Sequence, residues 1–167
     1  KDATGADETR AAAHPHSARA RFQFNTYAPG LGVSQPALRP IEDPKTIITR
    51  LPPGFTGNPQ AAEACPLDMV AQPDGIMFPT LCPAGSIVGY VFVKGLTPLP
   101  QPVVNVAPEP GYPAEFGFSE VGLTFTVYPE LRSDDDYGVN MVVGAANINW
   151  NTSVDFTFCS YGVNMTF

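Results

Sequence analysis

The chain has 167 residues, of which 44% are hydrophobic and 15% are charged, and its formal net charge is −7. This length and hydrophobic content exclude a disordered chain and predict one folded domain. Its nine basic residues form no cluster, which argues against nucleic acid as a partner, because Lys and Arg must replace the counterions of the phosphates. No window reaches the roughly 18 apolar residues of a membrane-spanning helix.

The first segment differs from the rest in composition. Residues 1–13 contain no aromatic residue and no β-branched residue other than threonine, so we expect a flexible N-terminal arm. Residues 14–167 are then expected to form a single domain. Within it, residues 19–27 alternate between polar side chains and small or aromatic ones, including Phe22 and Phe24. A period of two is typical of a half-buried strand.

Seven further segments have the character of strands, and turn residues separate them. They are residues 45–51, 86–93, 102–107, 114–119, 122–131, 137–146 and 154–161. The prolines of residues 102–107 predict a short edge strand. Residues 59–71 have helix-compatible content, which Pro66 limits to a turn or two on either side. About eight strands with little helix predict an all-β fold, an antiparallel β-sandwich of the immunoglobulin-like or jelly-roll-like kind.

Two of the three cysteines flank a proline-rich loop. Cys65 and Cys82 have 16 residues between them, and proline follows each. Metal binding by this pair would need further ligands or a closer spacing, so we expect a disulfide that pins the loop across a sheet edge. Such a bond predicts an oxidising, extracellular environment. Cys159 is the unpaired thiol, for which burial as a small apolar side chain and an intermolecular disulfide are the alternatives.

Short motifs follow one another in a fixed order along the chain. They are HP at residues 14–15, LPPG at 51–54, GNP at 57–59, CPAGSIVG at 82–89, PEPGYPAEFGF at 108–118 and DYG at 136–138. In this order they resemble a β-module repeated in large secreted and surface proteins of high-GC bacteria. The pattern differs at the end, where YGVN at residues 161–164 stands in place of a Trp-Gly-Val-Pro element. The resemblance implies secretion, modular repetition and a location at the cell surface, and it implies no catalytic residue.

The densest group of carboxylates lies near residue 135. Asp134, Asp135 and Asp136, with Glu130 nearby, offer the oxygen ligands that calcium prefers, and many extracellular β-modules bind calcium in such loops. The spacing is not that of an EF-hand, and aspartates are also common in turns without a ligand. The sequence therefore predicts no cofactor, with calcium as the alternative.

A second candidate site surrounds the single tryptophan. Trp150 lies between Asn149 and Asn151, and an aromatic ring flanked by amides could bind a carbohydrate. The alternative is that Trp150 caps one end of the sandwich.

Together these features predict a non-catalytic structural or adhesive module at the bacterial cell surface. Its partners would be neighbouring modules or identical subunits. The alternatives are a glycan-binding module using Trp150, a pilus-like subunit that polymerises by strand addition with residues 1–24 as the donor, and a hydrolase whose carboxylates meet only in the fold.

Overall fold

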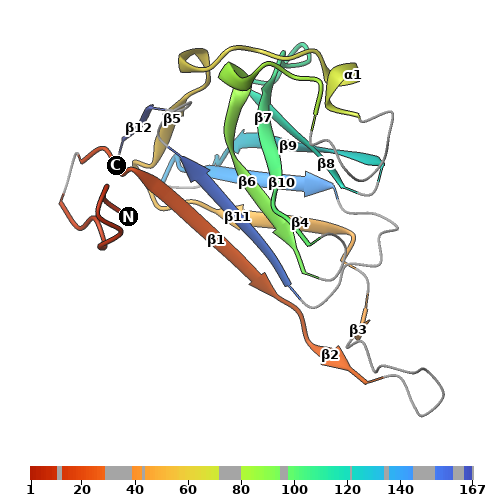
Figure 1. Ribbon diagram of the computed structural model, residues 1–167. Coiled ribbons are helices and arrows are strands. Elements are labelled where there is room, and N and C mark those ends of the chain that lie inside the picture. The colour runs from red at the N-terminus through yellow and green to blue at the C-terminus, as the bar shows by residue number, and fades with distance from the viewer. Residues whose placement is uncertain are drawn as a thin grey trace.

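A sheet of eight antiparallel strands dominates the computed structural model (Figure 1). The structure describes residues 1–10, 13–28, 39–42, 44–71, 80–94, 98–120, 122–133, 136–144, 153–159 and 164–166. Its strands are β1 (Ser17–Gln23), β2 (Thr26–Tyr27), β3 (Arg39–Pro40), β4 (Thr46–Arg50), β5 (Thr56–Asn58), β6 (Ile87–Val93), β7 (Gln101–Val106), β8 (Glu115–Glu120), β9 (Leu123–Leu131), β10 (Val139–Gly144), β11 (Ser153–Cys159) and β12 (Asn164–Thr166). Short helical turns are η1 (Pro59–Ala61), α1 (Leu67–Val70) and η2 (Ala84–Ser86).

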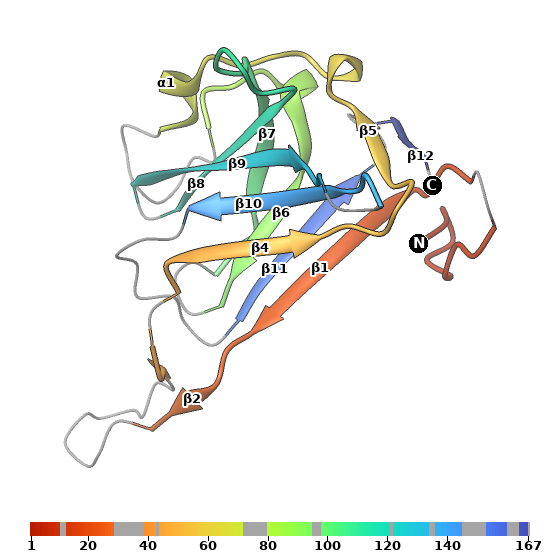
Figure 2. The same ribbon diagram turned by 180° about the vertical axis from the view of Figure 1, so that it is seen from behind.

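The order of strands in the main sheet is β1-β11-β6-β7-β8-β9-β10-β4. The sheet curves until it is nearly closed, so that the half containing β1, β11 and β6 faces the half containing β9, β10 and β4 (Figure 2). The predicted all-β fold is therefore confirmed, and each of the eight predicted strands overlaps one strand of this sheet. β12 pairs with β5, and β2 pairs with β3 in a ribbon that projects away from the sheet.

The alternation predicted for residues 19–27 is present in the structure. Phe22 and Phe24 are half-buried, whereas Arg21 and Gln23 are exposed. β1 pairs with β11 in an antiparallel register that places Phe22 opposite Val154. Because side chains of a strand point to opposite faces in turn, one face of β1 packs on the interior of the sheet.

The prediction of an edge position for residues 102–107 is wrong. β7 lies between β6 and β8, and every residue from Pro102 to Val106 is buried. Pro102 is tolerated because it is only the second residue of the strand, and a register shift interrupts the β6–β7 ladder between Ile87 and Gly89. By contrast, the two short helical turns on either side of Pro66 were predicted correctly.

The inner faces of the strands form the main core. Phe118 is fully buried, its ring stacks on Phe125 with centroids 4.9 Å apart, and it meets Phe156 edge-on at 5.6 Å. These rings come from β8, β9 and β11, so they join the two facing halves of the sheet. Aromatic pairs of this geometry contribute about 1 kcal/mol each beyond the area that they bury.

A smaller core lies on the outer face of the sheet. Val104 and Val106 of β7 pack there against Val70 of α1 and the two cysteines. A Cβ on Gly117 would lie 3.3 Å from both methyl carbons of Val70 and 3.0 Å from Val106 Cγ2. The absence of a side chain at Gly117 therefore lets the segment that contains α1 pack closely on β8.

Candidate functional site

The disulfide Cys65–Cys82 holds the segment that contains α1 on the outer face of the sheet. The predicted pairing is present, with the Cα atoms 5.6 Å apart. The bond does not join two strands of the sheet, because Cys65 forms only an isolated bridge beside Val106 and Cys82 precedes η2. Cys65 N donates to Asn105 O (2.9 Å), and Ala107 N donates to Cys65 O (3.1 Å). The disulfide therefore holds a loop against β7. Both cysteines are buried.

The buried amide of Asn105 fixes the start of the same segment. Asn105 is 4% exposed, and its Nδ2 donates to Pro59 O (2.9 Å) and Ala62 O (3.3 Å). These bonds cross more than 40 residues of sequence and satisfy carbonyl groups of η1 and of the residue that follows it. Sequence analysis did not identify Asn105, because a lone asparagine inside an apolar strand gives no motif.

The carboxylate of Asp136 binds an arginine. Its two oxygens accept hydrogen bonds from Nε and Nη2 of Arg132, both at 2.8 Å, and Oδ1 also accepts from Gly138 N (2.9 Å). These bonds lower the pKa of Asp136 to about 2, and the bond with Arg132 has the largest effect. The side chain of Arg132 is 3% exposed. Asp136 thus serves to neutralise a buried guanidinium.

This guanidinium connects three segments of the chain. Arg132 Nη1 donates to Val139 O (3.0 Å) and Asn140 Oδ1 (3.2 Å), and Nη2 donates to Leu51 O (3.1 Å). Leu51 follows β4 directly, and its own N–H donates to Val139 O (2.9 Å). Arg132 therefore ties the end of β4 to the β9–β10 hairpin.

The proposed calcium site is only partly within the described residues. Asp134 and Asp135 lie outside them. Glu130 is exposed on β9 opposite Asn140, and the Asp136 carboxylate is bound to Arg132. Among the residues that the structure describes, no three His, Cys, Asp or Glu side chains form a metal-binding group. Calcium binding stays a prediction, in which Asp136 would have to leave its arginine.

The proposed carbohydrate site lies outside the described residues, which include none of Asn149, Trp150 and Asn151. Cys159 is the last residue of β11 and is paired with Ser17, and nothing is described of its side chain. The glycan site and the state of this thiol stay predictions.

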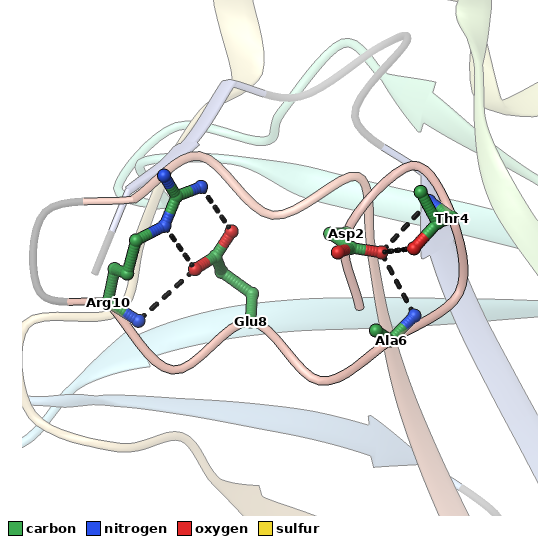
Figure 3. A network of polar contacts seen from close by, with 5 residues as sticks. All are labelled: Asp2, Thr4, Ala6, Glu8 and Arg10. Carbon is green, nitrogen blue, oxygen red and sulfur yellow. Dashed lines mark hydrogen bonds and ion pairs between the residues drawn. The ribbon is translucent and has the colours of Figure 1, made fainter.

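The N-terminal arm contains two local groups of polar contacts (Figure 3). Asp2 Oδ1 accepts hydrogen bonds from Thr4 N, Thr4 Oγ1 and Ala6 N, at 2.7 to 2.9 Å. Glu8 accepts from three nitrogens of Arg10, and these bonds lower the pKa of Glu8 to about 2. Because every one of these contacts spans at most four residues, none of them fixes the arm to the sheet. Its flexibility stays a prediction.

The arm meets the sheet at the beginning of β1. Lys1 N donates to Ser17 O (2.7 Å), and Ser17 N donates to Lys1 O (3.2 Å). The side chain of Lys1 forms an ion pair with Asp7. The backbone of Ser17 is thus already occupied by the arm on one side, while β11 lies on the other.

The sheet has an open side, by which we mean the gap between its two edge strands, β1 and β4. The strands lie at an angle to one another across this gap, with the end of β4 facing the beginning of β1 (Figure 2). An apolar cavity of about 660 Å³ opens there. Its walls include Phe116, Val127, Val143 and Phe156 of the main core, so the interior of the sheet is continuous with the open side.

An apolar stripe crosses the outer face beside β4. It consists of Ile48, Val142 and Tyr128, which are direct neighbours on β4, β10 and β9, and we call it the outer stripe. Ile48 is 57% exposed, and the ring of Tyr128 packs at a tilt against that of Tyr112, with centroids 4.5 Å apart. Of the three, Ile48 is exposed, and Val142 and Tyr128 are half-buried. An apolar stripe beside an edge strand is typical of an interaction surface.

The Tyr128 hydroxyl stays neutral at physiological pH. Its hydrogen bond with Thr126 acts to lower the pKa, but burial and the carboxylates of Glu115 and Glu109 outweigh that bond. The net effect places the pKa of Tyr128 above its ordinary value of about 10. The outer stripe therefore carries no charge of its own.

No family model matches the chain, and no curated protein or solved structure shows a significant similarity to it. Among the described residues, no helix is long and apolar enough to cross a membrane. The assignment of a function therefore depends on the geometry of the fold itself.

Proposed function

We propose that the chain is a non-catalytic structural or adhesive module of a secreted or cell-surface bacterial protein. In this proposal it contacts neighbouring modules or identical subunits through β4 and the outer stripe. The observation that carries the proposal is the position of Ile48, which is exposed on the last strand of the sheet and continuous with Val142 and Tyr128.

An edge strand and an apolar stripe together can hold a second β-module. The edge offers backbone hydrogen-bonding groups to another strand, and the stripe offers apolar area that such contact would remove from water. Burying the exposed part of one large aliphatic side chain contributes about 1 kcal/mol, so several such residues are needed for a stable contact. The disulfide supports the extracellular part of the proposal, because such bonds persist in oxidising compartments.

Strand addition by the N-terminal segment receives less support. Ser17–Gln23 already forms β1 and pairs with β11 over its whole length. A donor segment that includes residues 17–23 would have to leave this ladder first. Contact through β4 requires no such rearrangement.

Sedimentation velocity of the purified chain over a range of concentrations tests the proposal. We expect reversible association that Ile48→Lys abolishes, because a charge at the β4 end of the stripe would have to be desolvated. Tyr90→Lys is the matched control, since Tyr90 is 45% exposed and lies on β6, between β11 and β7. A strictly monomeric wild-type chain, or equal association of the Ile48→Lys variant, would contradict the proposal.

A further inference from the structure

The cavity on the open side is a separate feature from the outer stripe. The stripe lies on the outer face of the sheet, whereas the cavity is bounded by inner-face side chains such as Met141, Val143 and Phe116. Its volume of about 660 Å³ falls within the range of pockets that hold small organic ligands. Protein interiors are otherwise packed to the density of organic crystals, so an opening of this size into a core is unusual.

The charges around the cavity indicate an uncharged ligand. Arg19 and Arg50 border it, but they are exposed and alternate with inner-face residues, so their side chains point to the outer face. Lys1 and Asp7 lie at the mouth and neutralise each other in an ion pair. Among the described residues that line the cavity, no charged group is therefore placed to bind an anionic or cationic head group within the walls.

The geometry also disfavours an added strand as the occupant. At the mouth, Ser17 already exchanges two backbone hydrogen bonds with Lys1. Because β1 and β4 lie at an angle to one another, an incoming strand could follow only one of them (Figure 2). A small molecule needs no backbone pairing, and the aromatic and aliphatic walls suffice to hold it.

We infer that this cavity is a binding site for a neutral, apolar small molecule of the alkyl or aromatic class. The ligand displaces water from the walls formed by Phe55, Phe116 and Phe156, and its binding is driven by burial of apolar surface. This site goes beyond the proposed contact with neighbouring modules, and neither depends on the other.

Fluorescence titration with the uncharged dye N-phenyl-1-naphthylamine tests the inference. We expect saturable binding to one site, and competition by decanol that is at least about tenfold stronger than by decanoate, which would have to desolvate a carboxylate. Ala20 is on the inner face of β1 and lines the cavity. Ala20→Phe should therefore fill the site and weaken dye binding at least about tenfold.

Gln23→Phe is the control, because Gln23 is exposed on the other face of the same strand and the variant adds the same ring without entering the cavity. Ala18→Leu is a smaller filling variant, should Ala20→Phe fail to show the wild-type circular dichroism spectrum. The inference is overturned if the dye does not bind, if both filling variants bind it like the wild type, or if decanoate competes as well as decanol. Dye binding that disappears as the chain associates would also overturn it, because the occupant would then be a neighbouring copy.

Discussion

Gly138 leaves the space that the buried guanidinium of Arg132 occupies, so Gly138→Ala should break the connection between β4 and the β9–β10 hairpin. A Cβ at this position would lie 1.8 Å from Arg132 Nη2 and 2.5 Å from Cζ. Gly138 is not among the described glycines with a positive φ, so alanine can adopt its backbone conformation and the effect is purely steric. The arginine must move, and it then loses its bonds to Leu51 O, Val139 O and Asn140.

The size of the effect follows from those bonds. Hydrogen bonds to a charged group contribute about 2 kcal/mol each but are not additive within one network, so we expect a loss of about 2 to 3 kcal/mol. Alanine restricts the unfolded chain more than glycine does, and this effect offsets about 0.5 kcal/mol of the loss. The free energy of unfolding should therefore fall by about 2 kcal/mol.

Urea unfolding followed by circular dichroism measures this change. Gly144→Ala is the control, since Gly144 is the last residue of β10, which begins directly after Gly138, and an added Cβ at Gly144 meets no atom within 4 Å. Because Gly138→Ala and Arg132→Met disrupt the same network, the double variant should lose little more than either single variant. A stability of Gly138→Ala equal to that of Gly144→Ala, or full additivity with Arg132→Met, would refute the reasoning.

Three more predictions concern the disulfide, Asp136 and Asn105. Reducing Cys65–Cys82 should lower the free energy of unfolding by about 3 kcal/mol, given the length of the loop that it closes; coincident urea curves with and without reductant would contradict this. Because the folded-state pKa of Asp136 is depressed to about 2, its contribution should be present above about pH 4 and lost as the pH falls through 2. The stabilities of wild type and Asp136→Asn should then differ at neutral pH and converge in acid, and a constant difference would exclude the ion pair as the cause. Asn105→Ala should cost about 1 to 2 kcal/mol and increase amide hydrogen exchange around residues 59–63, whereas unchanged exchange there would show that the Asn105 bonds do not hold the segment.

The sequence was sufficient to predict the eight strands of the main sheet, because their alternation and their turn residues are local signals, whereas the short strands β3 and β5 were not predicted. The alternation of Phe22 and Phe24 with polar residues identified the buried face of β1. Pro66 correctly predicted a break between two short helical turns. The position of β7 was not predictable, since neighbours in a sheet are determined by long-range pairing and the proline at 102 is equally compatible with an edge and with the start of an inner strand.

The candidate site was less predictable for the same reason. The partner of Asp136 is four residues away, but the burial of Arg132 depends on Leu51, which is 81 residues distant. The outer stripe joins three strands at one residue each, and the cavity appears only once the sheet curves. Single residues on separate strands give no motif. Cys65 and Cys82 flank one proline-rich loop, so their disulfide could be predicted from the sequence.

Hydrogen exchange of the β4 amides is the most direct test of the claim that the chain contacts its neighbours through this edge. The measurement compares residues 46–50 at low and high protein concentration, with the amides of β6 as an internal reference, because β6 already has strands on both sides. The account predicts that the β4 amides gain protection as the chain associates, while those of β6 do not change. Protection that rises elsewhere, or association that leaves β4 unprotected, would contradict it.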